Sequence, residues 1–336
     1  MRIARFAKGD GVAYGVVEGE LEQPLTIAEL HGHPFGIDPA GVRYTGHRYP
    51  LAEVRLLAPV LPSKVVAVGK NYAEHVKEMR KLSGEDELPA EPVLFLKPST
   101  SVTGHGDRIA YPVKLTDRVD YEGELAVIIG RLCRDVPKER AVDVIFGYTC
   151  ANDVTARDLQ FKDGQWTRAK GFDTFCPLGP WMETGLDPAD LGLTTTVNGA
   201  VRQHARTSEL LWDVPSLIEF VSSVMTLLPG DVLLTGTPEG VGALTDGDEV
   251  SVTIESIGTL TNRVVIRDLP GPAEFSRNLP GQAVAQVAEL PLHMRLRPAV
   301  AAVGEDRDLL VLYRDLVVGG EDRGRRADAV HQADAD

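Results

Sequence analysis

Three acidic side chains in two neighbouring apolar segments have the types and the spacing of a metal site. Glu122 and Glu124 lie two residues apart at the start of the apolar run 125–129, and Asp153 ends the next such run. Side chains alternate between the faces of a strand, so both glutamates would point the same way. Like charges this close repel unless a cation lies between them. The three oxygens would suit Mg²⁺, Mn²⁺ or Ca²⁺ better than zinc, and the alternative is acids in water at a strand end.

A histidine and a glutamate follow the apolar segment 65–68. His75 and Glu78 are three residues apart in AEHVKEM, which begins at Ala73. On a helix this spacing puts both side chains on one face. A glutamate that accepts a hydrogen bond from the imidazole fixes its tautomer and raises its basicity, so the pair could activate a water molecule. The alternative is an exposed histidine on a charged helix.

Basic and amide side chains lie close to these acids in the sequence. Arg157 and Gln160 follow Asp153 by four and seven residues, so all three share a face if a helical turn begins at Asp153. They would then bind the carboxylate and the carbonyl of a substrate. Lys170 precedes a glycine and an aromatic residue in a loop that could fold over a ligand. Lys97 follows another apolar segment, and a solvated surface charge is an equally good interpretation of it.

A glycine-rich turn follows the apolar segment GDVLLTG. The backbone N–H groups of Gly236 and Thr237 in this turn could bind an oxyanion of the substrate. The turn lacks the G-K-[ST] ending of a phosphate-binding loop, so we do not expect a nucleotide phosphate here.

The elements that must position these residues are mostly strands. Apolar runs rich in β-branched residues and bounded by Gly or Pro recur from Lys64 onward, which predicts a sheet or barrel. Two segments have helical spacing instead: residues 208–228, and a more polar stretch at residues 73–85. The fold class predicted is therefore mixed β with few helices.

Changes in composition and in strand pattern divide the chain into three parts. Short strands at residues 2–7 and 11–21 and a Gly, Pro and His-rich connector at residues 31–50 indicate a small β-rich N-terminal domain, residues 1–60. Residues 61–268 would form the main domain. Residues 269–336 are rich in Ala, Arg and acidic residues and read as a poorly ordered tail.

Composition and charge narrow the class of partner. The chain is 43% hydrophobic and 25% charged, as in ordinary globular proteins. A formal net charge of −14 argues against nucleic acid, because phosphate backbones are bound by clustered Lys and Arg. The sequence has neither a signal-peptide pattern nor a run of about 18 apolar residues, so no membrane partner is expected. Its 3 cysteines lack CxxC spacing, which fits reduced thiols in the cytoplasm.

Seven motifs, in their order along the chain, resemble the fumarylacetoacetate hydrolase family over about residues 60–266. They are GKNYAEHVKEM, FLKPST, YEGELAVIIG, NDVTARDLQ, RAKGFDTFCPLGP, VNG and LLTGTPEGVG. The resemblance implies a catalytic domain that is a mixed β-roll with a divalent metal at its open end, and a homodimer. The first 60 residues resemble the small domain of many bacterial members, whereas the tail has no counterpart in the pattern.

The resemblance also implies roles for the candidate residues. Glu122, Glu124 and Asp153 stand at the positions that ligate Mg²⁺ or Mn²⁺, with Ca²⁺ as a possible replacement. His75 and Glu78 match a catalytic dyad on a lid helix of the hydrolase and decarboxylase branch. Four further residues match positions that line the substrate pocket of that branch: Arg157, Gln160, Lys170 and Thr237.

These observations predict a divalent-metal-dependent enzyme that acts on a small 2-oxo acid, by hydrolysis of an acylpyruvate C–C bond or by oxaloacetate-type decarboxylation through a metal-bound enolate. In hydrolysis His75 would take a proton from water, while Lys170 and Arg157 stabilise the oxyanion and the carboxylate. One alternative is isomerisation or decarboxylation of a 2-hydroxyhepta-2,4-diene-1,7-dioate in aromatic catabolism, which needs no activated water. An alternative of another class is a non-catalytic metal-binding protein.

Overall fold

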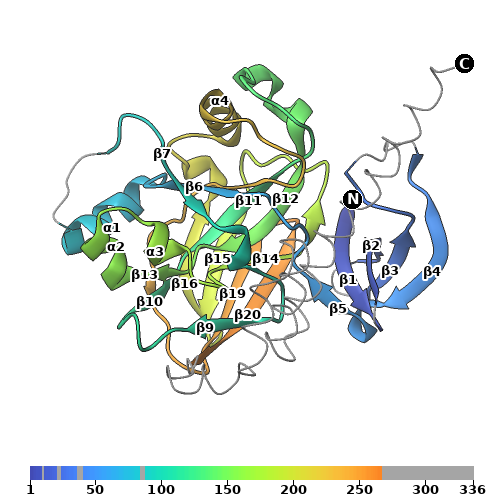
Figure 1. Ribbon diagram of the computed structural model, residues 1–336, viewed down its shortest axis with the longest axis horizontal. Coiled ribbons are helices and arrows are strands. Elements are labelled where there is room, and N and C mark those ends of the chain that lie inside the picture. Colours follow the sequence, from blue (N-terminus) through green and yellow to red (C-terminus); the bar gives the residue numbers. More distant parts are fainter. Residues whose placement is uncertain (10, 21–23, 36–40, 84–87, 267–336) are drawn as a thin grey trace, which may run out of the picture. The chain divides into compact units, whose positions relative to one another are not determined.

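The computed structural model describes residues 1–266 except residues 10, 21–23, 36–40 and 84–87 (Figure 1). The tail predicted at residues 269–336 lies outside the described residues. In the part that is described, no helix is long and apolar enough to span a membrane.

Within that part, one mixed sheet of twelve strands runs through the molecule. Its strands are β1 (Arg2–Lys8), β2 (Gly11–Glu18), β3 (Thr26–Leu30), β4 (Tyr44–Pro50), β5 (Arg55–Leu57), β6 (Val65–Gly69), β7 (Val93–Lys97), β8 (Val102–Thr103), β11 (Gly123–Ile129), β12 (Ile145–Asn152), β14 (Cys176–Glu183) and β17 (Val232–Leu234). The order across the sheet is β4-β3-β2-β1-β14-β12-β11-β17-β6-β7, with β5 paired to β1 and β8 to β14. The pairing of β1 with β14 joins the N-terminal strands to the strands that carry the acidic residues.

Two smaller sheets complete the β structure of the described residues. The five-stranded sheet has the order β16-β15-β19-β20-β9 and the three-stranded sheet the order β13-β10-β18. Their strands are β9 (Arg108–Tyr111), β10 (Val119–Tyr121), β13 (Thr155–Ala156), β15 (Gly192–Val197), β16 (Ala200–Arg206), β18 (Gly242–Ala243), β19 (Glu249–Ile254) and β20 (Gly258–Ile266).

The largest core cluster joins the central sheet to the five-stranded sheet. Leu125 and Val127 of β11 share this cluster with Leu193 of β15 and Val252 of β19, and all four side chains are buried. The alternate residues of β11, such as Ile128, face a second cluster on the other side of the sheet. A strand buried on both faces reads as a continuous apolar run, which is the pattern of the sequence here.

Helices are few among the residues that the structure describes, as predicted. They are α1 (Ala73–Ser83), α2 (Arg157–Asp163), α3 (Thr167–Lys170) and α4 (Val214–Val224), with 3-10 turns at Leu51–Glu53, Ser99–Ser101, Lys138–Val144 and Thr207–Glu209. α2 and α3 contact one another, and α3 also contacts β7 and β13 (Figure 1). The described residues are thus mostly β, and the predicted fold class is confirmed.

Two predicted boundaries were wrong. The helix expected over residues 208–228 begins only at Val214, because the Asp213 side chain caps it by accepting a hydrogen bond from the Ser216 N–H at 3.0 Å. The connector expected at residues 31–50 contains β4, which pairs with β3. Pairing with the preceding strand stabilises an edge strand whose own composition is typical of turns.

Candidate active site

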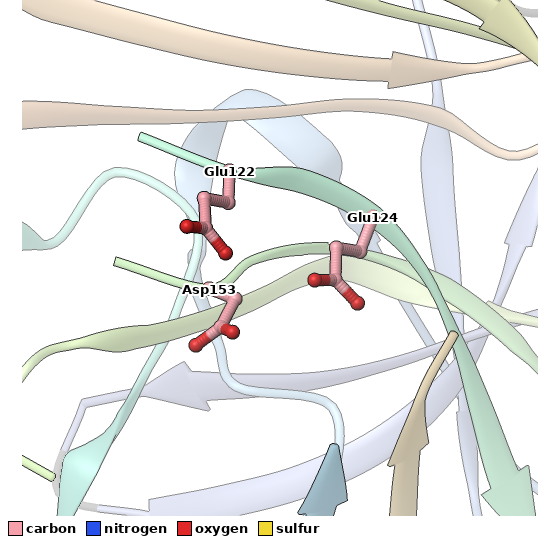
Figure 2. Close-up of side chains that lie close together, drawn as sticks. All are labelled: Glu122, Glu124 and Asp153. Carbon is pink, nitrogen blue, oxygen red and sulfur yellow. The ribbon is translucent and has the colours of Figure 1, made fainter. Parts of the chain in front are cut away.

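Three carboxylates meet where β10 ends, β11 begins and β12 ends (Figure 2). β11 pairs with β12 so that Gly123 lies opposite Asn152, and the Asp153 N–H donates to the Glu122 carbonyl oxygen at 2.8 Å. Each of Glu122, Glu124 and Asp153 offers one oxygen, and these oxygens lie within 4.8 Å of one another. All three residues are buried, so this is not a solvated strand end.

The glycine between the two glutamates explains why their side chains share a face. A Cβ atom at Gly123 would lie 2.1 Å from the Thr195 hydroxyl oxygen, so the opposite face of the strand has no room for a side chain. The Gly123 N–H donates to the Gln203 amide oxygen at 2.9 Å, which holds the backbone against β16. Glu122 and Glu124 therefore both project to the other side, as their two-residue spacing predicts.

Two buried lysines hold Asp153 between them. The Lys170 ammonium donates to Glu122 Oε2 at 2.7 Å and to Asp153 Oδ2 at 2.6 Å. The Lys97 ammonium donates to Asp153 Oδ1 at 2.5 Å and to the Val154 carbonyl oxygen at 3.2 Å. Lys97 is 1% exposed, so its interpretation as a solvated surface charge was wrong.

Arg157 is also buried and is held by protein acceptors. Its guanidinium donates to Glu122, to Asp120 Oδ2 at 2.8 Å and to the Gln160 side-chain oxygen at 2.5 Å. α2 begins at Arg157, so the expectation of a helical turn starting at Asp153 was wrong. The backbone stays extended as far as Ala156 because β13 pairs with β10. The cluster brings Arg157 and Asp153 together through Glu122 and Lys170.

The charges of this cluster act on one another. Burial alone would raise the pKa of the Glu122 carboxyl, but the positive charges of Lys170 and Arg157 outweigh it and lower that pKa. Burial would lower the pKa of Lys170, but the carboxylates of Asp153 and Glu122 raise it, so Lys170 stays a cation. Burial, followed by the negative charges of Asp153 and Glu122, raises the pKa of Glu124 well above its usual range. Glu124 is therefore the carboxyl that the protein's own cations neutralise least.

The cluster suits a hard divalent cation. Its donors are all carboxylate oxygens, and an ionised carboxylate offers about four lone-pair sites, more than its hydrogen bonds within the protein occupy. A divalent ion bound beside Glu124 would offset burial and the charges of Asp153 and Glu122, which raise the pKa of this carboxyl. The residues present thus fit Mg²⁺ or Mn²⁺, and Glu122, Glu124 and Asp153 would hold it.

His75 and Glu78 lie together on α1. Glu78 Oε2 is 3.3 Å from His75 Nδ1, and the Gly240 N–H donates to both carboxylate oxygens of Glu78 at 3.1 Å. His75 is buried, so it is not an exposed histidine on a charged helix. Because a carboxylate only accepts hydrogen bonds, Nδ1 carries the proton of the neutral ring, and Nε2 is then the acceptor.

The glycine-rich turn contacts the acids directly. The Gly236 N–H donates to Glu124 Oε2 at 2.6 Å, so the oxyanion that it binds in this structure is a carboxylate of the protein itself. Gly236 has a φ of 102°, and a Cβ atom there would lie 2.8 Å from Asn71 Cβ, so glycine is required. The Thr237 hydroxyl donates to the Gly123 carbonyl oxygen at 3.0 Å.

A cavity of about 340 Å³ brings most of the predicted site residues together. Its polar lining consists of Lys70, which the sequence did not single out, and of eight residues that it did: His75, Glu122, Glu124, Asp153, Arg157, Gln160, Lys170 and Thr237. Two other predicted residues contact this lining: Glu78 contacts His75, and the Gly236 N–H donates to Glu124. The remaining lining includes Phe95 and Trp166, whose ring centroids are 5.2 Å apart. A cavity with an apolar wall and converging polar groups is typical of a small-molecule site.

Sequence reasoning missed the buried groups that support the site. Asp120 is fully buried and accepts hydrogen bonds from Arg157 and Arg118. Lys97 is also buried, which the sequence alone did not distinguish from a charge on the surface. Asp120 lies two residues before Glu122 on the same side of the strand, so the period-2 argument applied to the glutamates would also have found it.

The chain matches the fumarylacetoacetate (FAA) hydrolase C-terminal family over residues 64–265 and the Rv2993c-like, N-terminal family over residues 1–59. Protein Rv2993c of Mycobacterium tuberculosis is 56% identical over 275 residues, which are 80% of this chain and 100% of that protein. Oxaloacetate tautomerase YisK of Bacillus subtilis is 43% identical over 228 residues, which are 64% of this chain and 75% of that protein.

Solved structures share the fold. The 2-hydroxyhepta-2,4-diene-1,7-dioate isomerase of Mycobacterium marinum is 55% identical with a TM-score of 0.72, and the match covers 80% of this chain and 100% of that chain. Maleylpyruvate hydrolase of Sphingobium sp. SYK-6, solved with manganese(II) and pyruvate, is 35% identical with a TM-score of 0.63 over the same shares. With both the sequence family and the fold matched across its catalytic part, the chain belongs to the fumarylacetoacetate hydrolase family.

Proposed function

We propose that this protein is a divalent-metal-dependent enzyme that moves a proton at the carbon next to the 2-oxo group of a small 2-oxo acid. Keto–enol tautomerisation of oxaloacetate is the simplest such reaction, and the same step is part of decarboxylation and of C–C bond hydrolysis. The observation that carries the proposal is the cavity that holds the three carboxylates together with the free ring nitrogen of a paired histidine. The 43% identity to an oxaloacetate tautomerase supports it.

Each charged residue of the cavity has a part in this proposal. A divalent ion held by Glu122, Glu124 and Asp153 would supply a Lewis acid beside the 2-oxo group. His75 would carry the proton to and from carbon on Nε2, because Glu78 keeps its own hydrogen bond on Nδ1.

The cations would stabilise the negative charge that develops on the substrate as the proton leaves carbon. Lys170 uses two of its three N–H donors on Glu122 and Asp153, which leaves one for a substrate oxygen. Gln160 accepts from Arg157 with its side-chain oxygen, so its NH₂ group is available to the substrate carboxylate. Positive charge fixed in a buried site acts strongly on charge that develops there.

Hydrolysis of an acylpyruvate C–C bond is the second candidate. The His75–Glu78 pair favours it, because an imidazole with a fixed tautomer can also take a proton from water. The structural similarity to a maleylpyruvate hydrolase with bound manganese(II) and pyruvate supports this alternative and the choice of Mg²⁺ or Mn²⁺.

A homodimer in the cytoplasm, with residues 1–60 and 61–268 as separate domains, is part of the same proposal.

The test compares two substrates on metal-stripped protein with and without added Mn²⁺ or Mg²⁺. Loss of the enol absorbance of oxaloacetate reports tautomerisation, and pyruvate release from oxaloacetate or acetylpyruvate reports C–C cleavage. We expect the metal to restore the first reaction. His75→Ala should abolish this reaction but leave metal binding intact. His204→Ala, at an exposed histidine, should leave both the reaction and metal binding unchanged. Full activity in His75→Ala would remove His75 from the mechanism, and no metal-dependent reaction with either substrate would refute the proposed function.

A further inference from the structure

We propose that Tyr121 is a positioning residue: through the turn at Gly240 it sets the place of Glu78 and so the orientation and tautomer of His75. The proposal deepens the proposed function, because it gives a support to the group that would move the proton. Tyr121 is buried and lies one residue before Glu122.

An unbroken series of contacts joins Tyr121 to His75. The Tyr121 hydroxyl donates to the Gly240 carbonyl oxygen at 2.8 Å. The N–H of the same glycine donates to both carboxylate oxygens of Glu78, each at 3.1 Å, and Glu78 Oε2 is 3.3 Å from His75 Nδ1. Tyr121 therefore restrains the carbonyl group of Gly240, while the N–H of Gly240 binds Glu78.

Gly240 needs a restraint from outside. It has a φ of 96°, and a Cβ atom there would lie 2.1 Å from the Arg202 carbonyl oxygen, so only glycine fits. Glycine also has the greatest backbone freedom of any residue, so a turn built on it does not fix the direction of its own N–H. The hydroxyl of Tyr121 supplies this restraint because it binds the carbonyl of the same residue.

Tyr121 itself is held firmly. It pairs with Gly242 in the three-stranded sheet, and a Cβ atom at Gly242 would lie 2.9 Å from the tyrosine oxygen, so the ring lies directly against that glycine.

One short segment thereby places three parts of the site. Asp120 accepts a hydrogen bond from Arg157, Glu122 accepts one from Lys170, and Tyr121 between them reaches the turn that binds Glu78. Side chains alternate along a strand, so the middle residue points away from the acids and toward the turn. The same stretch of backbone thus positions both the carboxylates and the histidine.

A double-mutant cycle tests whether Tyr121 acts through Glu78. Tyr121→Phe keeps the ring and removes only the hydroxyl, and we expect kcat to fall about tenfold with KM nearly unchanged, since one buried hydrogen bond is lost. In Glu78→Ala, whose turnover is already low, adding Tyr121→Phe should cause no further loss. An equal fold-loss in both backgrounds would overturn the proposal. Tyr148→Phe, another buried tyrosine, serves as the control and should keep full turnover.

A second measurement does not depend on turnover. Nitrogen-15 NMR of the His75 ring in metal-free protein should show Nδ1 protonated in the wild type and in Tyr148→Phe, and a mixture of tautomers in Tyr121→Phe. Ring signals that are identical in wild type and Tyr121→Phe would overturn the positioning role. If no 2-oxo acid is turned over, the proposed function fails, while the NMR result still decides the role of Tyr121.

Discussion

Replacement of Lys97 by methionine should destabilise the protein strongly. The Lys97 side chain is 0% exposed and that of Asp153 1%, and their ion pair spans 2.5 Å. Methionine fills the space of the lysine stem but leaves Asp153 Oδ1 and the Val154 carbonyl without this donor. Removal of one partner of a buried ion pair costs about 3–5 kcal/mol, and we expect a loss near the lower end of this range because Lys170 still donates to Asp153 Oδ2.

The free energy of unfolding is measured by urea denaturation in EDTA, so that bound metal does not contribute. Lys77→Met is the matched control, because Lys77 pairs with Glu74 on α1 with side chains 65% and 58% exposed. An exposed pair is worth less than about 1 kcal/mol, so this variant should unfold almost as the wild type does. A loss below about 1 kcal/mol in Lys97→Met, or equal losses in both variants, would refute the assignment of Lys97 as a buried structural cation.

Two further predictions follow from burial. Burial raises the pKa of Glu124, and the charges of Asp153 and Glu122 raise it further. The folded metal-free protein therefore keeps a proton that the unfolded chain releases. As a result, the free energy of unfolding falls as the pH rises through that raised pKa. Glu124→Gln should flatten this pH dependence in urea titrations made in EDTA, and an equally steep dependence in the variant would contradict the prediction. Burial also raises the pKa of Cys150 and of Cys176 to about 12. Both thiols should therefore resist a disulfide reagent at about pH 8 until guanidinium unfolds the protein, and rapid labelling of the native protein would show the burial to be wrong.

The acidic part of the site was predictable because its geometry is local. Glu122 and Glu124 share a face through the alternation of a strand, and Asp153 ends the neighbouring strand. His75 and Glu78 were predictable in the same way from the helical three-residue spacing. In each case a few residues of sequence determine the relative direction of the side chains.

The supporting part depends on contacts between distant segments. Lys97 reaches Asp153 across 56 residues of sequence, and Gly240 reaches Glu78 across 162, so no local period could pair them. The start of α2 at Arg157 was missed for a related reason, because pairing of β13 with β10 keeps the preceding backbone extended. Contacts between segments far apart in the sequence, which local propensity does not encode, decided each of these features.

Turnover should depend on a metal ion that the three carboxylates hold. Mn²⁺ titrated into metal-stripped protein should bind to one site per chain, and the rate of enol-oxaloacetate loss in the same samples should rise in proportion to the occupied fraction. In Glu124→Gln both the binding and the metal-dependent rate should be lost or strongly weakened, because the least neutralised carboxyl is gone. Saturable binding that survives unchanged in Glu124→Gln, or turnover that is complete before any Mn²⁺ is bound, would contradict the account.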